Sequence, residues 1–270
     1  MIAPLFDLHK EVYGAGDPIL CLHGLGANIF TWRHFIKPFS ETNQLILVDF
    51  RGFGASPKPD DTHYSIQEHA DDIYRMILRD NLQRLTLIGN SFGGGVALLL
   101  AIRLCEQDPG RLSKLVLIDS GGYEEFLPGY LKLARSFLGK LMIYLPPGKA
   151  AARFVLRASY FDPKKISDEQ VNAYAVPIAS PGGRHAFLQT AKQCIPPNIH
   201  EIIPRLKNIT APTLILWGRQ DRVIPLKVGE LLHQAIPNST LEVLEQCGHI
   251  PHEEKPEETI ASIARFLQDA

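Results

Sequence analysis

The sequence predicts an α/β fold with a mostly parallel central sheet, helices on both faces and one helical insertion. Short aliphatic runs alternate with segments of helical periodicity, which is typical of strand–helix–strand units with right-handed crossovers. The runs are almost uninterruptedly apolar, and this indicates strands that are covered on both faces, as in a parallel sheet. One interval of more than 90 residues, 120–212, shows no strand pattern.

The individual elements follow from these patterns in chain order. Six apolar runs are predicted to be strands: Pro18–Leu22, Gln44–Asp49, Leu85–Gly89, Lys114–Asp119, Thr213–Trp217 and Thr240–Leu244. Four segments with apolar residues at helical spacing are predicted to be helices: Ile66–Leu78, Phe92–Leu104, Leu226–Ala235 and Pro256–Leu267. Proline is favoured in the first turn of a helix, which supports the last of these.

The long interval without strands is predicted to be helical. Its helical segments are expected at Tyr130–Tyr144, 149–158, 168–175 and 184–192, separated by prolines that include Pro163, Pro177 and Pro181. We therefore expect an α/β core made of residues 1–121 and 198–270, with a helical cap, or lid, of residues 122–197. Apolar residues of the cap either pack on the core or line a pocket.

Composition excludes several classes of protein. Lys and Arg number 28 and Asp and Glu 29, so the formal net charge is −1, and 45% of residues are hydrophobic. This balance is that of a soluble globular chain rather than a disordered one. No basic excess is available for nucleic acid, and no apolar stretch reaches the roughly 18–20 residues of a membrane span. We expect a small apolar molecule as the partner, with no nucleic acid and no membrane.

The number and spacing of the cysteines and the first residues of the sequence indicate the cellular compartment. The four cysteines are widely spaced and form no C-x-x-C pair: Cys21, Cys105, Cys194 and Cys247. A disulfide framework or a structural zinc site is therefore not expected. The first ten residues lack the basic start and long apolar centre of a signal peptide. Together these features predict a cytoplasmic protein.

A G-x-S-x-G motif spans Gly89–Gly93, between a predicted strand and a predicted helix. That context is typical of a nucleophile elbow, a sharp turn that lifts a serine hydroxyl clear of the sheet. Ser91 is the candidate nucleophile. The amide of Phe92 would then lie at a helix N-terminus, where it can stabilise an oxyanion.

A serine nucleophile needs a base and an acid that orients the base. His249 lies beside Gly248 in the loop after the last strand and is the candidate base. His252 is an alternative base, and the two histidines together could also be interpreted as a metal pair, although no ligand cluster accompanies them. Asp221, four residues beyond Trp217, is the candidate acid, with Asp119 as the alternative.

Two further loops follow predicted strands. In His23–Asn28 the glycines allow a close backbone approach, so the amide of Leu25 is the expected second oxyanion donor. His23 is predicted to brace this loop by hydrogen bonds rather than to act as a base. Asp49 and Arg51 are predicted to fix the geometry of the loop that follows Gln44–Asp49.

Taken together, the motifs resemble those of the α/β-hydrolase fold superfamily. The matching segments are H-G-L-G at 23–26, D-F-R-G-F-G-A-S at 49–56, G-N-S-F-G-G at 89–94, G-R-Q-D at 218–221 and G-H-I-P-H-E at 248–253. The resemblance implies a serine hydrolase with Ser91 as nucleophile, His249 as base and Asp221 as acid. It also implies an oxyanion hole of Leu25 and Phe92, and a cap inserted after the sixth strand of that fold.

Within the superfamily, the sequence resembles both carboxylesterases and meta-cleavage product hydrolases. Asn90 before the serine resembles the carbon–carbon hydrolases, but their H-G-x-G-P-G-A loop and the tryptophan after the histidine are absent. Ile250 stands where that tryptophan would be, and Arg184 is a candidate for their lid arginine. Asn90 and Ile250 are expected to contact substrate.

The sequence therefore predicts a serine hydrolase, independent of cofactors and metals, that cleaves esters of small to medium apolar acyl groups through an acyl-enzyme. Carbon–carbon hydrolysis of the meta-cleavage type is the first alternative. A ligand-binding module with a vestigial triad is the second. A third is an interaction scaffold that uses the amphipathic segment Tyr130–Tyr144. The oligomeric state is left open.

Overall fold

A computed structural model describes residues 6–126 and 148–268. Seven strands of this part form one sheet in the order β1-β3-β2-β4-β5-β6-β7, in which only β1 is antiparallel to its neighbour. The predicted α/β class with a mostly parallel sheet is confirmed. The strands are β1 Lys10–Tyr13, β2 Pro18–Leu22, β3 Gln44–Val48, β4 Leu85–Asn90, β5 Leu112–Ile118, β6 Thr213–Gly218 and β7 Ser239–Leu244.

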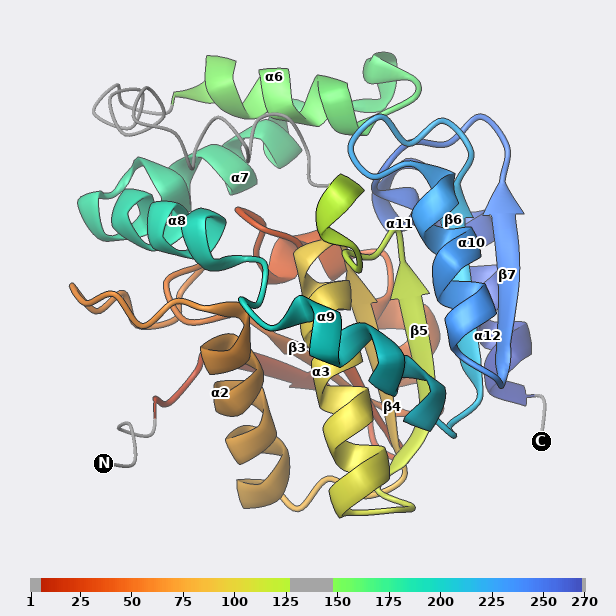
Figure 1. The fold of residues 1–270 in the computed structure, drawn as a ribbon. Helices are drawn as coiled ribbons and strands as arrows, with labels where there is room; N and C mark the ends of the chain where they lie inside the picture. The colour runs from red at the N-terminus through yellow and green to blue at the C-terminus, as the bar shows by residue number, and fades with distance from the viewer. Residues whose placement is uncertain (1–5, 127–147, 269–270) are drawn as a thin grey trace.

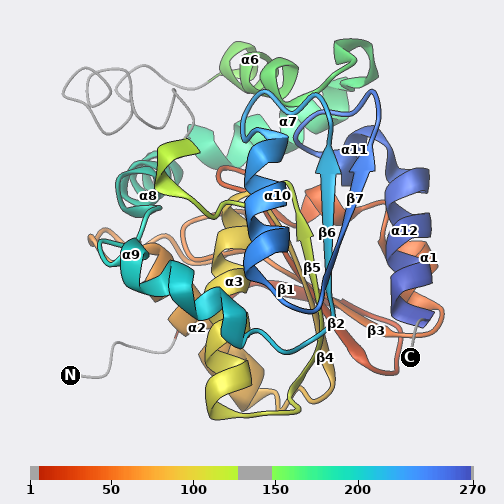
Figure 2. The same ribbon diagram turned by 45° about the vertical axis from the view of Figure 1, so that its right-hand side comes forward.

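Helices cover both faces of the sheet because the strand side chains alternate between two apolar clusters. Along β2, Leu20 and Leu22 belong to the larger cluster, whereas Ile19 and Cys21 belong to the smaller one. Helices α2, α3 and α10 pack on the larger cluster, and α1 and α12 lie on the opposite face (Figure 2). These helices are α1 Ile36–Ser40, α2 Ile66–Arg79, α3 Phe92–Gln107, α10 Leu226–Ala235 and α12 Pro256–Gln268.

The carboxyl ends of the central strands lie in register. Asn90 at the end of β4 pairs with Ile118 of β5, and Ile118 pairs with Leu216 of β6. The loops that follow these strands therefore meet at one edge of the sheet. Three helices lie over this edge (Figure 1): α6 Lys149–Ser159, α7 Asp168–Ala179 and α8 Pro181–Gln193.

The described part of the predicted helical interval is helical, and it lies between β5 and β6. Pro177 lies inside α7 rather than between helices. The predicted helix Tyr130–Tyr144 lies outside the described residues.

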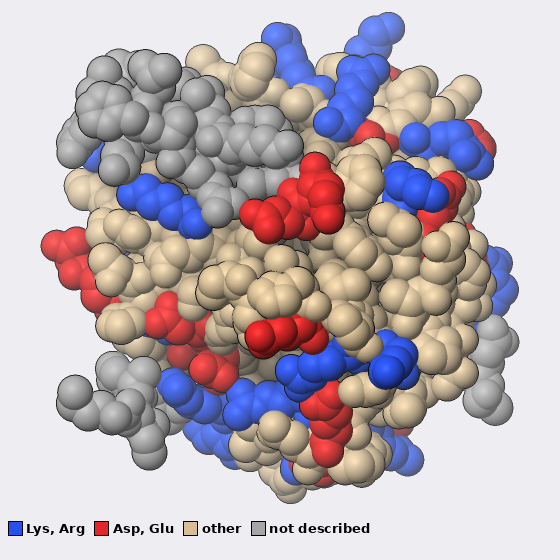
Figure 3. Space-filling view, viewed as in Figure 1, with Lys and Arg blue, Asp and Glu red and all other residues tan. Residues whose placement is uncertain are grey.

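All six predicted strands and the four predicted core helices are present within two or three residues of their expected ends. β1 was not predicted, because its four partly exposed residues lack a long apolar run. Figure 3 shows acidic and basic side chains interspersed over one face, with no single large basic area. In the part of the chain that the structure describes, no helix has the length and apolarity needed to cross a bilayer.

Candidate active site

Ser91 occupies a strained turn between β4 and α3. Its φ of 55° and ψ of −118° place a non-glycine residue at positive φ, which only a tightly packed turn maintains. Glycines make the packing close enough: a Cβ on Gly93 would lie 2.2 Å from the Leu22 carbonyl oxygen, and one on Gly89 would lie 2.4 Å from that of Gly93. The local sequence thus folds as the predicted elbow, with Ser91 at its apex.

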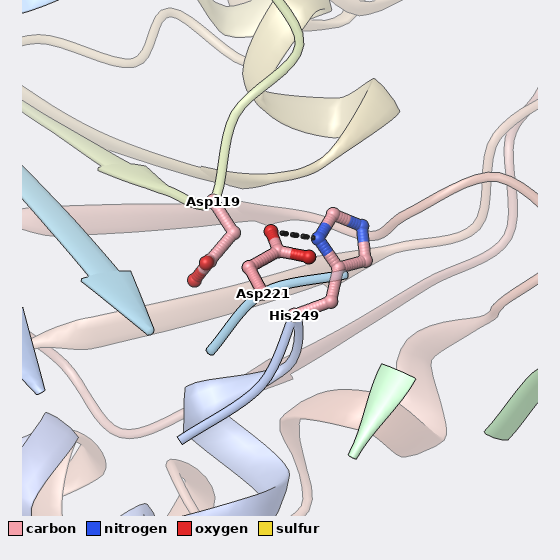
Figure 4. Close-up of side chains that lie close together, drawn as sticks. All are labelled: Asp119, Asp221 and His249. Carbon is pink, nitrogen blue, oxygen red and sulfur yellow. Dashed lines mark hydrogen bonds and ion pairs between the residues drawn. The ribbon is translucent and has the colours of Figure 1, made fainter. Parts of the chain in front are cut away.

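Ser91, His249 and Asp221 form one hydrogen-bonded line. His249 Nε2 lies 2.8 Å from Ser91 Oγ, and His249 Nδ1 lies 2.7 Å from Asp221 Oδ2, the bond drawn in Figure 4. The Asp221 and His249 side chains are nearly fully buried. Asp221 Oδ1 accepts the amides of Val223 and Ile224 at 2.7 and 3.0 Å, which fixes the carboxylate. A neutral imidazole can donate from Nδ1 and accept the serine proton at Nε2.

Asp119, the alternative acid, makes no hydrogen bond to His249 in the described structure. It lies at the end of β5, on the far side of Asp221 from the imidazole (Figure 4). Its Oδ1 accepts the Gly218 amide at 3.0 Å, and its Oδ2 has no partner among the described residues. Burial, together with the charge of Asp221, raises the pKa of Asp119 well above its ordinary value.

One group of described residues has the donor types and spacing that a metal ion would need. Ligand atoms of Asp119, Asp221 and His249 all lie within 4.8 Å of one another. The hydrogen bond between His249 and Asp221 already uses the imidazole nitrogen that faces the carboxylates. We therefore interpret Asp221 and His249 as a hydrogen-bonded pair with Asp119 beside it, and His252 is not part of this group.

The structure separates His252, the competing base, from Ser91. Its ring is fully buried, stacks on Trp32 at a centroid distance of 4.5 Å and is hydrogen-bonded through Nε2 to Thr31 Oγ1 at 2.8 Å. Burial lowers the pKa of His252 well below its ordinary value. His252 is thus held by structural contacts, and it does not belong to the group of Asp119, Asp221 and His249.

His23 braces its loop, as predicted. Its Nδ1 lies 2.8 Å from the Gly24 carbonyl oxygen, and its Nε2 accepts the Phe50 amide at 3.1 Å. The ring is completely buried, and burial lowers its pKa. Both ring nitrogens are occupied by backbone groups, so His23 has none left to serve Ser91.

The predicted loop-fixing roles of Asp49 and Arg51 are also confirmed. The Asp49 carboxylate accepts the amides of Ile29 and Ala55, each at 2.8 Å. Arg51 donates to the buried Asp72 carboxylate at 2.8 Å. These contacts hold the loops around the edge of the sheet without reaching Ser91.

Leu25 and Phe92, the expected oxyanion donors, both lie beside Ser91. A Cβ on Gly24 would be 3.4 Å from Ser91 Cβ, so the loop before Leu25 approaches the nucleophile closely. Phe92 is the first residue of α3, and its amide has no acceptor within that helix. Ser91, Leu25 and Phe92 line the same cavity.

The cavity measures roughly 860 Å³ when the open solvent at its mouth is included, and its walls are almost wholly apolar. They come from α3, from the loop after β5 and from α9 Ile199–Ile202 with the following 3-10 turn η4 Ile203–Asn208. No charged side chain lines it in the described part of the chain. Sequence reasoning did not assign this wall, although Ile199, Ile202, Ile203 and Leu206 repeat at helical spacing and could have indicated it.

Asn90 and Ile250, predicted to contact substrate, are not wall residues of this cavity. Asn90 Nδ2 donates to the carbonyls of Ile118 at 3.0 Å and His249 at 3.1 Å, so it ties the elbow to the histidine loop. Ile250 packs in a small apolar cluster that includes Tyr160. The cavity gives no support to a substrate contact for either residue.

Comparisons with known proteins agree with this fold. A 2-hydroxy-6-oxo-6-phenylhexa-2,4-dienoate hydrolase of Comamonas testosteroni is 31% identical over 270 residues, which cover 97% of this chain and 92% of that protein. A meta-cleavage product hydrolase from Pseudomonas fluorescens IP01 has the same fold, with a TM-score of 0.82 at 24% identity over 98% of this chain and 95% of its own.

An esterase from Exiguobacterium antarcticum also shares the fold, with a TM-score of 0.82 at 24% identity over 98% of this chain and 96% of its own. The family profile described as alpha/beta hydrolase fold matches residues 17–256, most of the chain. The serine elbow, the parallel sheet and these matches lead to one conclusion: the chain belongs to the alpha/beta hydrolase fold family, and it is a hydrolase.

Proposed function

We propose that this protein is a cofactor-independent serine hydrolase that cleaves esters of small to medium apolar acyl groups. The observation that carries the proposal is the hydrogen-bonded line from Asp221 through His249 to Ser91, which ends at the wall of an apolar cavity. A buried acid, an imidazole and a hydroxyl in this order are what acyl transfer through a serine requires.

In the first half of the reaction, Ser91 Oγ attacks the ester carbonyl carbon while His249 Nε2 takes the hydroxyl proton. Asp221 keeps the imidazole Nδ1–H directed toward itself and stabilises the imidazolium. His249 then gives its proton to the departing alkoxide, and the acyl group remains on Ser91. In the second half, His249 deprotonates a water that attacks the acyl-enzyme, and Ser91 regains its proton as the acid leaves.

The tetrahedral oxyanion is bound by the amides of Leu25 and Phe92 in this proposal. The Phe92 amide also lies at the positive end of the α3 dipole, which favours developing negative charge. Removing one such donor typically costs on the order of 10²–10³ in rate.

The apolar cavity supports a neutral, apolar acyl group. Leu99 lines it seven residues beyond Phe92 on α3, which corresponds to about 10 Å along the helix. An acyl chain that lies along this wall would contact uncharged side chains. Burial of the chain would contribute roughly 0.8 kcal/mol per methylene group.

The helices α6, α7 and α8 act as the cap in this proposal, with 1–121 and 198–270 as the core and 122–197 as the inserted unit. Their position over the carboxyl edge of the sheet supports this division (Figure 1). A cap at that place restricts bulk water at the reacting atoms and shapes access to the cavity.

Carbon–carbon hydrolysis is the second candidate function, and the Comamonas testosteroni relative favours it. The name of that enzyme's substrate denotes a carboxylate, which would need a cation or several donors once it leaves water. The described cavity wall offers no such cation. Arg184, the candidate lid arginine, donates to the Ala179 carbonyl at 2.7 Å and is not a wall residue. Ester hydrolysis is therefore the better supported function.

Steady-state assays with p-nitrophenyl butyrate and octanoate test the proposal. We expect turnover by the wild type and a loss of about 10⁴-fold or more in Ser91→Ala, because a triad acts as a unit. Comparable turnover by both proteins would contradict the assignment of Ser91. A higher kcat/KM for a 2-hydroxy-6-oxo-dienoate than for either ester would instead establish the carbon–carbon hydrolase.

Covalent labelling with a fluorophosphonate separates an enzyme from a binding module. An aligned triad labels Ser91, whereas a vestigial one leaves the serine unreactive. We expect stoichiometric labelling that Ser91→Ala abolishes. An unlabelled wild-type protein that still binds apolar esters would support the binding module.

A further inference from the structure

The short helix α11 Pro251–Glu254 begins two residues after His249 and carries two buried glutamates. Glu253 is 6% exposed and Glu254 is 2% exposed. Glutamate side chains are almost never buried to this degree unless they are fully partnered. The partners of these two side chains show what α11 holds together.

The Glu254 carboxylate accepts three backbone amides. Its Oε2 accepts those of Gly248 at 2.7 Å and Phe161 at 3.0 Å, and its Oε1 accepts that of Asp162 at 2.7 Å. Gly248 precedes His249, whereas Phe161 and Asp162 follow the end of α6. A single buried charge therefore joins the histidine loop to the inserted helices.

The backbone around His249 makes two more contacts with the same end of α6. The His249 amide donates to the Ser159 carbonyl oxygen at 2.7 Å. A Cβ on Gly248 would lie only 2.2 Å from that oxygen, so only glycine permits this approach. Because the Gly248 and His249 amides are both fixed in this way, the direction of the imidazole depends on where α6 ends.

Glu253 holds the inserted helices by a separate route. It accepts hydrogen bonds from Gln170 Nε2 at 2.8 Å and Tyr174 Oη, both on α7. On the core side it accepts from Thr31 Oγ1 at 2.7 Å and is paired with Arg33. None of these bonds reaches the loop of His249, which makes Glu253 a natural control for Glu254.

We propose that Glu254 is a positioning residue that sets the alignment of His249 with Ser91 by fastening the histidine loop to the end of α6. The inference rests on the proposed role of His249 as the base. Glu254 lies outside the cavity wall, so it would influence the chemical step and not the binding of the acyl group.

Glu254→Gln tests this role with little change in volume. Glutamine keeps one acceptor oxygen, and its NH₂ group must face at least one of the three amide donors. We expect kcat for p-nitrophenyl butyrate to fall about tenfold to a hundredfold with KM unchanged, as is typical when a reacting group is misplaced by a fraction of an ångström to 1 Å.

The matched control is Glu253→Gln, assayed at a temperature at which both variants are folded. It disturbs an equally buried carboxylate that holds the same helices, so its melting temperature should also fall. Its kcat should remain that of the wild type. Equal losses of kcat in the two variants, or none in Glu254→Gln, would overturn the inference.

A second measurement does not depend on turnover. The His249 Nδ1 proton in its bond to Asp221 gives a low-field ¹H NMR signal, which is assigned by its disappearance in His249→Gln. Glu254→Gln should shift or broaden this signal, and Glu253→Gln should leave it in place. An unmoved signal in Glu254→Gln overturns the positioning role, while a wild type that keeps the signal but neither turns over nor labels contradicts only the proposed function.

Discussion

Ser91 and His249 are held by different parts of the molecule, although their side chains meet. The Ser91 backbone is fixed by the sheet and its loops: its amide donates to Ile118 O at 3.1 Å, and its carbonyl accepts the Gly121 amide at 2.9 Å. The His249 backbone is held from two sides: its amide donates to the Ser159 carbonyl of the inserted helices, and its carbonyl accepts from Asn90 Nδ2 of the core. The nucleophile thus belongs to the core, and the base is shared with the insertion.

This difference predicts that substitutions in the elbow and substitutions in the inserted helices have different effects on stability and catalysis. A change that disturbs the elbow should remove the nucleophile and the stability of the sheet together, because the same close contacts produce both. A change among the inserted helices should lower stability while the sheet persists, and should alter catalysis only where the histidine loop is touched. Three substitutions test this separation.

The largest effect is expected from Gly93→Val in the elbow. Any Cβ there would meet the Leu22 carbonyl oxygen at 2.2 Å, and a backbone atom between two buried strands has no room to move. We expect a loss of about 3 kcal/mol or more in the free energy of unfolding, together with loss of fluorophosphonate labelling. Urea denaturation followed by circular dichroism measures the first.

Gly148→Ala is the matched control, because a Cβ at this exposed position of the insertion meets no described residue within 4 Å. It should change the free energy of unfolding by less than about 1 kcal/mol, the cost of a weaker helix N-cap. If Gly93→Val were as stable as this control, the elbow would not be as rigid as the structure indicates.

A smaller effect is expected from Tyr174→Phe on α7. The change removes a hydroxyl that is hydrogen-bonded to the buried Glu253 and, at 3.0 Å, to Thr31. Loss of one donor to a buried charge should cost about 2 kcal/mol in the free energy of unfolding. The rate of labelling at Ser91 should stay unchanged, since the bond does not reach the histidine loop.

Tyr13→Phe provides the comparison for that change. Tyr13 also hydrogen-bonds a glutamate, Glu11, but on the partly exposed edge strand β1. Water can replace the lost partner there, so the expected cost is below about 0.5 kcal/mol. Equal losses in the free energy of unfolding for the two variants would show that burial of Glu253 does not make the loss of its hydrogen bond more costly.

The site was largely predictable from sequence because its residues follow apolar strands. Ser91 comes directly after such a run and Asp221 lies in the loop three residues beyond another, and the carboxyl ends of parallel strands meet at one edge. The order of the strands in the sheet and the buried partners of α11 were not predictable. A glutamate such as Glu254, two residues beyond His252, is typical of a solvated helix start. Two of its three amide donors, Phe161 and Asp162, come from the folded insertion, and the third is Gly248.

The cavity was less predictable for a related reason. Its wall residues Ile203 and Leu206 lie in the segment before β6, which the sequence assigned to the core without a role. Their helical spacing was visible, but periodicity alone does not tell whether an apolar stripe faces a packed core or a cavity. Whether the stripe faces a cavity depends on how much of the space between it and α3 is filled by the side chains of α3.

The smallest effect on stability is expected at Asp119, which follows β5 and lies beside Asp221 in the loop after β6 (Figure 4). Its pKa is raised by burial and by the neighbouring carboxylate, so the folded protein keeps a proton that the unfolded chain releases above the ordinary pKa of 3.8. The contribution of Asp119 to the free energy of unfolding should therefore fall as pH rises from about 3.8 toward the raised value. Asparagine cannot ionise, and its side-chain oxygen can still accept from the Gly218 amide.

Asp119→Asn should accordingly gain melting temperature relative to the wild type as pH rises, with the smallest difference near pH 4. Turnover of p-nitrophenyl butyrate at neutral pH should be retained, because Asp221 alone bonds the imidazole. Differential scanning fluorimetry at intervals between pH 4 and pH 8 measures the trend. If the difference in melting temperature instead shrinks as pH rises, Asp119 is ionised in the folded protein. If Asp119→Asn loses turnover, Asp119 assists Asp221 in orienting His249.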